Sequence, residues 1–235
     1  MYNFNTVNIV ALAIFAACLI IYSYKLKTAL KKPEESKRGM LNFFYGLWVK
    51  RMIDTEETIV AVQTMRNIIM STTFLSSAML VVLGLLVKFP STGINEIIDI
   101  TPFSSAAVAQ YKFLLLFGSI VFSLIMFLLS LRHMVRFTIL IGIPIREIET
   151  SATKKIESNS DTDEENRLDA RAVRTDVFLT AMNRFTYGLR GVYYSIVILF
   201  WFFSVYAFIA ATLIMTTFMI KLLDVKTPCV EETPI

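Results

Sequence analysis

The chain has 235 residues, of which 55% are hydrophobic, with a mean hydropathy of +0.61 and a net charge of only +4. A soluble domain of this size carries fewer apolar residues and spreads them at helix or strand periods, so the composition excludes an ordinary soluble protein. The single histidine, His133, excludes a multi-histidine metal or haem site within one chain, and neither cysteine has a metal-ligand spacing. We therefore expect no metal and no cofactor.

Four apolar stretches reach the length of about 20 residues that a helix needs to cross a bilayer. They lie at about 7–24, 59–87, 111–131 and 192–220. The first is preceded by no basic residue and continues apolar beyond Cys18, so we expect a retained helix and not a cleaved leader. The sequence predicts an all-α fold, in which residues 1–235 form a single membrane domain: a bundle of four transmembrane helices with short interfacial or cytoplasmic helices.

The first connecting segment contains a short amphipathic stretch at 41–52. Its spacing places Phe44, Leu47 and Trp48 on roughly one helical face. This pattern suits a helix in the headgroup layer with Tyr45 and Trp48 as interfacial anchors. A surface helix packed on its own protein explains the pattern equally well. Further along, residues 150–167 are polar, acidic and free of aromatic residues, which predicts a flexible cytoplasmic linker.

The basic residues predict an orientation. The segments between the spans at 25–58 and 132–191 hold eight and ten of the 23 Lys and Arg residues, and only four lie on the other side. Basic loops are retained in the cytoplasm, so both segments are predicted to be cytoplasmic. We therefore expect a multi-pass protein of the cell membrane with its N- and C-termini outside.

A polar cluster interrupts the second predicted span. Gln63, Arg66 and Asn67 follow the spacing i, i+3 and i+4, so they share one helix face. A charged group at this depth costs a few kcal/mol unless it is paired, hydrated or extended to the interface, and no acidic residue lies in any predicted span. Further polar groups border the third and fourth spans on the same predicted side: Arg132, Arg136, Asn183 and Arg190.

Three interpretations of these residues remain open. They form a hydrogen-bonded clasp that fixes helix register, they bind an anionic lipid headgroup or another anion, or they line a substrate path. Arginine suits phosphate and carboxylate groups because its guanidinium can donate two parallel hydrogen bonds.

The same region resembles a known family. The run RMIDTEETIVAVQTMRNIIMSTTFLSS, with AVQTMRN as its specific part, is similar to the signature of the multi-pass membrane family catalogued as domain of unknown function 599. Two later stretches, YKFLLLFGSIVFSLIMFLLSLRHMVRFTILIGIP and NRFTYGLRGVYYSIVILFWFF, resemble its later blocks. The resemblance covers most of residues 41–206. It implies an integral membrane protein and no known reaction.

No motif indicates catalysis. The chain has no G-x-S-x-G, no P-loop and no dinucleotide fingerprint, and one histidine supplies no Ser-His-Asp set. Its basic stretch at 25–38 lacks interleaved aromatic residues, so no nucleic-acid partner is expected. The leading hypothesis is a non-catalytic accessory or scaffold subunit of a membrane complex, whose partners are the bilayer and either other membrane proteins or further copies of itself. The alternative is an oligomeric transporter or channel that uses the arginine cluster, and a lipid-headgroup enzyme is less well supported.

Overall fold

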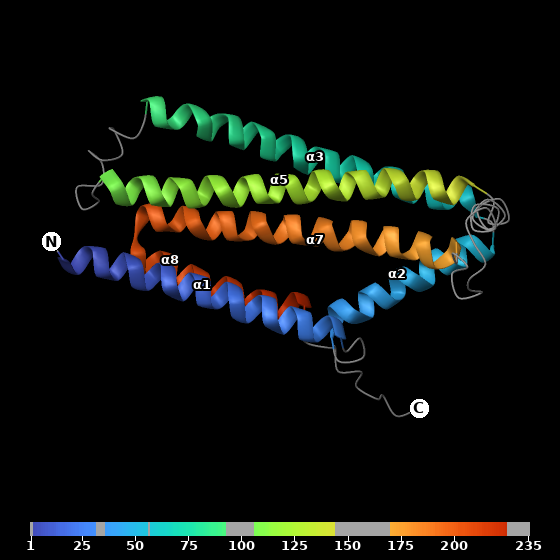
Figure 1. Ribbon diagram of the computed structural model, residues 1–235, viewed down its shortest axis with the longest axis horizontal. Helices are drawn as coiled ribbons and strands as arrows, with labels where there is room; N and C mark the ends of the chain where they lie inside the picture. The colour runs from blue at the N-terminus through green and yellow to red at the C-terminus, as the bar shows by residue number, and fades with distance from the viewer. Residues whose placement is uncertain (1, 32–35, 56, 93–105, 144–169, 225–235) are drawn as a thin grey trace, which may run out of the picture. The chain divides into compact units, whose positions relative to one another are not determined.

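The computed structural model describes residues 2–31, 36–55, 57–92, 106–143 and 170–224 (Figure 1). Over these residues the protein is entirely helical, which confirms the all-α prediction. The linker predicted at 150–167 lies outside the described residues. The elements are α1 (Tyr2–Lys31), α2 (Lys37–Asp54), α3 (Thr58–Thr92), α5 (Ala106–Gly142), α7 (Ala170–Phe203), α8 (Val205–Phe218) and a π-helical turn η3 (Met219–Asp224).

Four helices in the described part of the chain are long and apolar enough to cross a membrane, at Thr6–Thr28, Thr58–Lys88, Val108–Gly142 and Ala172–Phe203. The first three contain the predicted spans. Helices α3, α5 and α7 have 35, 37 and 34 residues. At 1.5 Å per residue each is about 50–55 Å long, whereas the hydrocarbon core of a bilayer is about 30 Å thick. Each of these helices is therefore about 20 Å longer than the hydrocarbon core is thick.

The fourth predicted span, at 192–220, is wrong in its boundaries. Helix α7 ends at Phe203, and Ser204 adopts an extended conformation with φ −159° and ψ 142° before α8 begins. The Ser204 backbone N–H still donates to the Phe200 carbonyl, while the Ser204 carbonyl accepts from the N–H of Phe208, each at 3.1 Å. Ser204 is thus the N-cap residue of α8, a position that serine favours. The apolar run belongs to two helices.

The first of two compact units comprises Met1–Phe43, Val81–Ser123 and Leu189–Ile235. Within it, α8 packs along α1 and runs in the same direction (Figure 1). The rings of Phe15 and Phe208 are 5.4 Å apart, and further along both helices Met219 packs against Tyr22 and Leu26. The end of η3 therefore lies at the same end of α1 as Leu26.

The second unit comprises Phe44–Leu80 and Leu124–Gly188. Its core draws residues from the C-terminal part of α2, the start of α3, the end of α5 and the start of α7. Phe178 is central, because its ring lies 4.9 Å from that of Phe137 and contacts the aromatic side chains of α2. The buried members are Val49, Met52, Ile53, Ala61, Met65, Phe137, Ile141 and Phe178.

A close approach of α5 and α7 depends on glycine. A Cβ atom added to Gly188 would lie 2.7 Å from two atoms of the buried Phe127 ring. That separation is shorter than any van der Waals contact, so the Phe127 ring would have to shift. By contrast, a Cβ atom added to Gly118 on the exposed side of α5 meets nothing within 4 Å. Small residues commonly permit such close packing between membrane helices.

We expect Gly188→Ala to destabilise the protein by about 1–3 kcal/mol, because the added methyl group overpacks the contact with Phe127. The matched control, Gly118→Ala, is expected to be neutral or stabilising by up to about 1 kcal/mol through helix propensity. Thermal denaturation of both variants in the same detergent measures the difference. Equal denaturation temperatures for the two variants would contradict this account of the α5–α7 contact.

Candidate functional site

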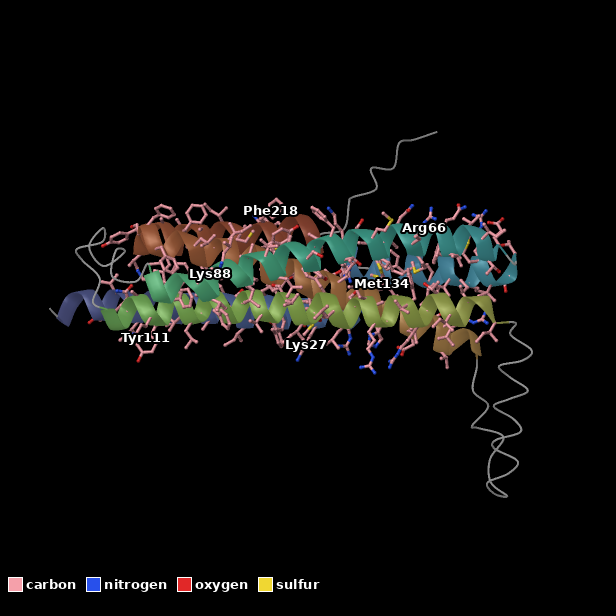
Figure 2. All side chains as sticks on the ribbon, turned by 90° about the horizontal axis from the view of Figure 1, so that it is seen from above. Lys27, Arg66, Lys88, Tyr111, Met134 and Phe218 are labelled. Atoms are coloured by element: carbon pink, nitrogen blue, oxygen red, sulfur yellow. The ribbon has the colours of Figure 1, made fainter. Side chains whose placement is uncertain are left out.

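The predicted cluster of Gln63, Arg66 and Asn67 lies on one face of α3, but that face is exposed. The opposite face of α3 makes the contacts: Met65 is fully buried, and the Thr72 hydroxyl lies 3.8 Å from the sulfur of Met134 on α5. Figure 2 shows Arg66 on the side of α3 away from Met134. Within the described part of the chain, the three polar side chains therefore do not form the clasp between helices that their spacing allowed.

Arg132 and Arg136 are also exposed, one helical turn apart on α5. Met134 and Phe137, which are buried in this stretch of α5, lie on a different face of the helix from the two arginines. Asn183 of α7 is half-buried. The structure thus places these cations on the outward faces of α3 and α5, and it does not bring them together into one pocket among the described residues.

Arg66, Arg132 and Arg184 lie at similar distances from the far ends of their candidate spans. Measured at 1.5 Å per residue, Arg66 lies about 33 Å from Lys88 at the far end of its span. Arg132 lies about 36 Å from Val108, and the half-buried Arg184 about 28 Å from Phe203. These distances match the thickness of a hydrocarbon core, about 30 Å. Each of the three helices therefore carries a basic residue about one hydrocarbon thickness from the far end of its candidate span.

Arg190 differs from the other predicted site residues because it is buried, in the first unit. Its guanidinium carbon lies 5.3 Å from the centre of the Tyr22 ring, a cation–π geometry between α7 and α1. The Tyr22 ring in turn meets Tyr194 edge-on, with 6.4 Å between their centres. Arg190 is accordingly part of the packing between these helices.

A second buried cation, Lys112, was not singled out from the sequence. Its Nζ donates a 3.0 Å hydrogen bond to the carbonyl of Trp201 and lies 5.5 Å from the centre of the indole ring. The indole N–H of Trp201 donates to the side-chain oxygen of Asn8 at 3.0 Å. Because Trp201 is in the last turn of α7, its carbonyl has no partner in its own helix, and Lys112 supplies one.

Arg174 makes an equivalent contact in the second unit. Its guanidinium donates to the carbonyl of Ile143, directly after the last residue of α5. Arg174 is 3% exposed, although it belongs to a stretch of the sequence that is rich in charge. For Lys112, the sequence shows only a basic residue near the start of an apolar run. That pattern does not reveal that Lys112 donates to the carbonyl of Trp201.

The predicted anchors Tyr45 and Trp48 are half-buried and contact Phe178, with ring centres 5.8 and 5.3 Å away. This supports the alternative that α2 packs on its own protein through these two residues. The structure has strongly exposed aromatic residues elsewhere (Figure 2 labels Tyr111): Tyr24, Phe74, Tyr111, Phe203 and Tyr206. Tyrosine and tryptophan side chains commonly mark a membrane interface.

Among the residues that the structure describes, no group of three or more His, Cys, Asp or Glu side chains is placed to hold a metal ion. The helices and their four candidate spans define a helical, multi-pass membrane protein. The family model described as "Protein of unknown function, DUF599" matches residues 10–228, and the chain therefore belongs to this family, as the sequence resemblance indicated. No curated protein and no solved structure matches the chain.

We expect Lys112→Met to destabilise the protein by about 1–3 kcal/mol, since methionine keeps the apolar stem but leaves the Trp201 carbonyl without its donor. Lys27→Met on the exposed surface of α1 is the matched control and should change stability little. Thermal denaturation in detergent, followed by tryptophan fluorescence, compares the two. A Lys112→Met protein as stable as the control would show that the capping contact is dispensable.

Proposed function

We propose that this protein is a non-catalytic accessory or scaffold subunit of a membrane complex, and that its cytoplasmic-side arginines bind anionic lipid headgroups. The observation that carries the lipid part is the exposure of Arg66 and Arg132 at about one hydrocarbon thickness from the far ends of their spans, with the exposed Arg136 one helical turn beyond Arg132. An arginine at this level reaches phosphate groups without crossing the apolar layer.

The scaffold part is supported by the second unit. Helices α3, α5 and α7 are longer than the hydrocarbon is thick, and the parts beyond it share a packed core with α2. Such a core holds the helix ends in fixed positions at the membrane surface. Apolar side chains remain exposed beside it, including Ile59 and Ile139, which offers contact area to a membrane-protein partner.

The exposed face of Gln63, Arg66 and Asn67 also suits the second hypothesis, an oligomeric transporter or channel. Polar groups on an outward face of a spanning helix can line a path only where several copies assemble around it. Anion flux in liposomes that disappears with Arg66→Gln would favour this alternative over a lipid-binding scaffold.

The orientation that we propose keeps the N-terminus outside and places the end of η3 in the cytoplasm. The basic segment at 25–38 still assigns the Leu26 end of α1 to the cytoplasmic side. Because α8 and η3 run beside α1 in the same direction, Met219 lies at that end too. Helix α8 with η3 then returns through the membrane after the turn at Ser204.

Replacing Arg66, Arg132 and Arg136 together by glutamine should reduce the amount of anionic lipid that co-purifies with the protein several-fold. Native mass spectrometry after purification from membranes measures the retained phosphatidylglycerol and cardiolipin. The double change Gln63→Ala and Asn67→Ala is the control, since it alters the same exposed face of α3 without changing charge. Unchanged retention in the arginine variant would defeat the lipid-binding proposal.

Single cysteines test the orientation, in a chain whose Cys18 and Cys229 are replaced by serine. Tyr206→Cys at the start of α8 and Lys221→Cys in η3 are both exposed positions. A membrane-impermeant maleimide added to intact cells should label Cys introduced at position 206 and should not label it at position 221 until the cells are opened. Labelling of position 221 from outside would restore the external C-terminus predicted from the sequence.

A further inference from the structure

Helix α2 has a second apolar face, opposite the one that packs. Phe44 and Leu47 are 52% and 46% exposed, and they lie three residues apart, so they share a side of the helix. Lys50 and Arg51 continue the same exposed side one turn later. The exposed face of α2, defined by these four residues, is therefore apolar at one end and basic at the other, where the exposed Asp54 follows one turn after Lys50.

The level of this face in the membrane follows from its packing partners. Tyr45 and Trp48 of α2 contact Phe178, and Val49 belongs to the same core as Met65. Along their own helices, Phe178 lies about 38 Å from Phe203 and Met65 about 35 Å from Lys88. These distances exceed the hydrocarbon thickness by about 8 and 5 Å, and the headgroup layer of one leaflet is about 5–8 Å deep.

We propose that the exposed face of α2 is immersed in the headgroup layer of the anionic, cytoplasmic leaflet, with Phe44 and Leu47 reaching the acyl boundary and Lys50 and Arg51 contacting phosphate groups. The proposal deepens the proposed function and rests on the same orientation. Aromatic and leucine side chains with adjacent basic residues are the composition that binds a helix to an anionic membrane surface. The sequence predicted such a helix but assigned its anchoring to Tyr45 and Trp48, which pack inward instead.

Charge complementarity favours lipid over a second copy of the chain as the occupant of this face. A second copy of the chain on this face would take the charged ends of Lys50 and Arg51 out of water, which costs free energy unless each meets an acidic partner. Lipid phosphates attract both cations while their ends stay in the hydrated headgroup layer.

A nitroxide spin label at Leu47→Cys tests the proposal in the full-length chain with Cys18 and Cys229 replaced by serine. The protein is reconstituted into vesicles of phosphatidylcholine with or without phosphatidylglycerol. Collisions with oxygen, which concentrates in lipid, are compared with collisions with a water-soluble nickel chelate. Two exposed positions calibrate the scale: Phe74→Cys on α3, about 21 Å from Lys88 and inside the hydrocarbon, and Glu57→Cys directly before α3, about 46 Å from Lys88 and in water.

The expected ratio of oxygen to nickel collisions at Leu47→Cys is several-fold higher than at Glu57→Cys and approaches that at Phe74→Cys when phosphatidylglycerol is present. Lys50→Glu with Arg51→Glu should abolish this dependence on anionic lipid. Nickel access equal to that at Glu57→Cys would overturn the proposal, and so would exclusion of both reagents, which would mean that another copy covers the face. Lipid retention by Arg66, Arg132 and Arg136 is measured separately, so a wet Leu47 with normal retention refutes only this inference.

Discussion

The structure depends on side-chain hydrogen-bond donors for the backbone carbonyls at the ends of helices. Where a helix end is buried, water does not reach its carbonyls, and an unsatisfied backbone group costs about 1–3 kcal/mol. Two buried cations meet the need: Lys112 donates to the carbonyl of Trp201 near the end of α7, and Arg174 donates to the carbonyl of Ile143 after α5. A cation at a helix C-terminus also meets the negative end of the helix dipole, so each contact is favourable twice.

The end of α7, where Lys112 donates to the Trp201 carbonyl, determines where α8 begins and packs. Because the helix stops at Phe203, the remaining apolar residues form α8, which packs beside α1. The ring of Trp201 then stacks on that of Phe208 at 4.8 Å, across the turn at Ser204. Trp201 thus makes three contacts: its carbonyl accepts from Lys112, its indole N–H donates to Asn8, and its ring stacks on Phe208 of α8.

The sequence predicted the helical fold and three of the spans because hydropathy over about 20 residues is a strong signal. It missed the turn at Ser204 because neither proline nor glycine marks it, and the apolar run continues without interruption from 192 to 220. The cap that stabilises this turn comes from Lys112, which lies 89 residues earlier in the chain. Local patterns carry no information about such a partner.

The polar cluster shows a similar limit. The spacing of Gln63, Arg66 and Asn67 correctly placed them on one face of α3, but spacing alone cannot tell whether a face points inward. The apolar face behind them gave a usable clue, since small or flexible residues that suit helix packing recur there and are buried in the structure: Ala61, Met65, Thr72 and Ser76. If the face with Gln63, Arg66 and Asn67 packed inward, the small and flexible residues on the opposite face would lie on the outside of the bundle.

The segment AVQTMRN, residues 61–67, has one buried face and one exposed face. Its residues Ala61 and Met65 are fully buried and hold α3 in the core shared with α2, α5 and α7. Its residues Gln63, Arg66 and Asn67 contribute nothing to that core, so the fold does not require their polarity. A guanidinium on an outward face at the edge of the hydrocarbon is inexpensive only if its end reaches headgroups or water. Among the described residues these three side chains lie on the exposed side of α3, which supports lipid as their proposed partner.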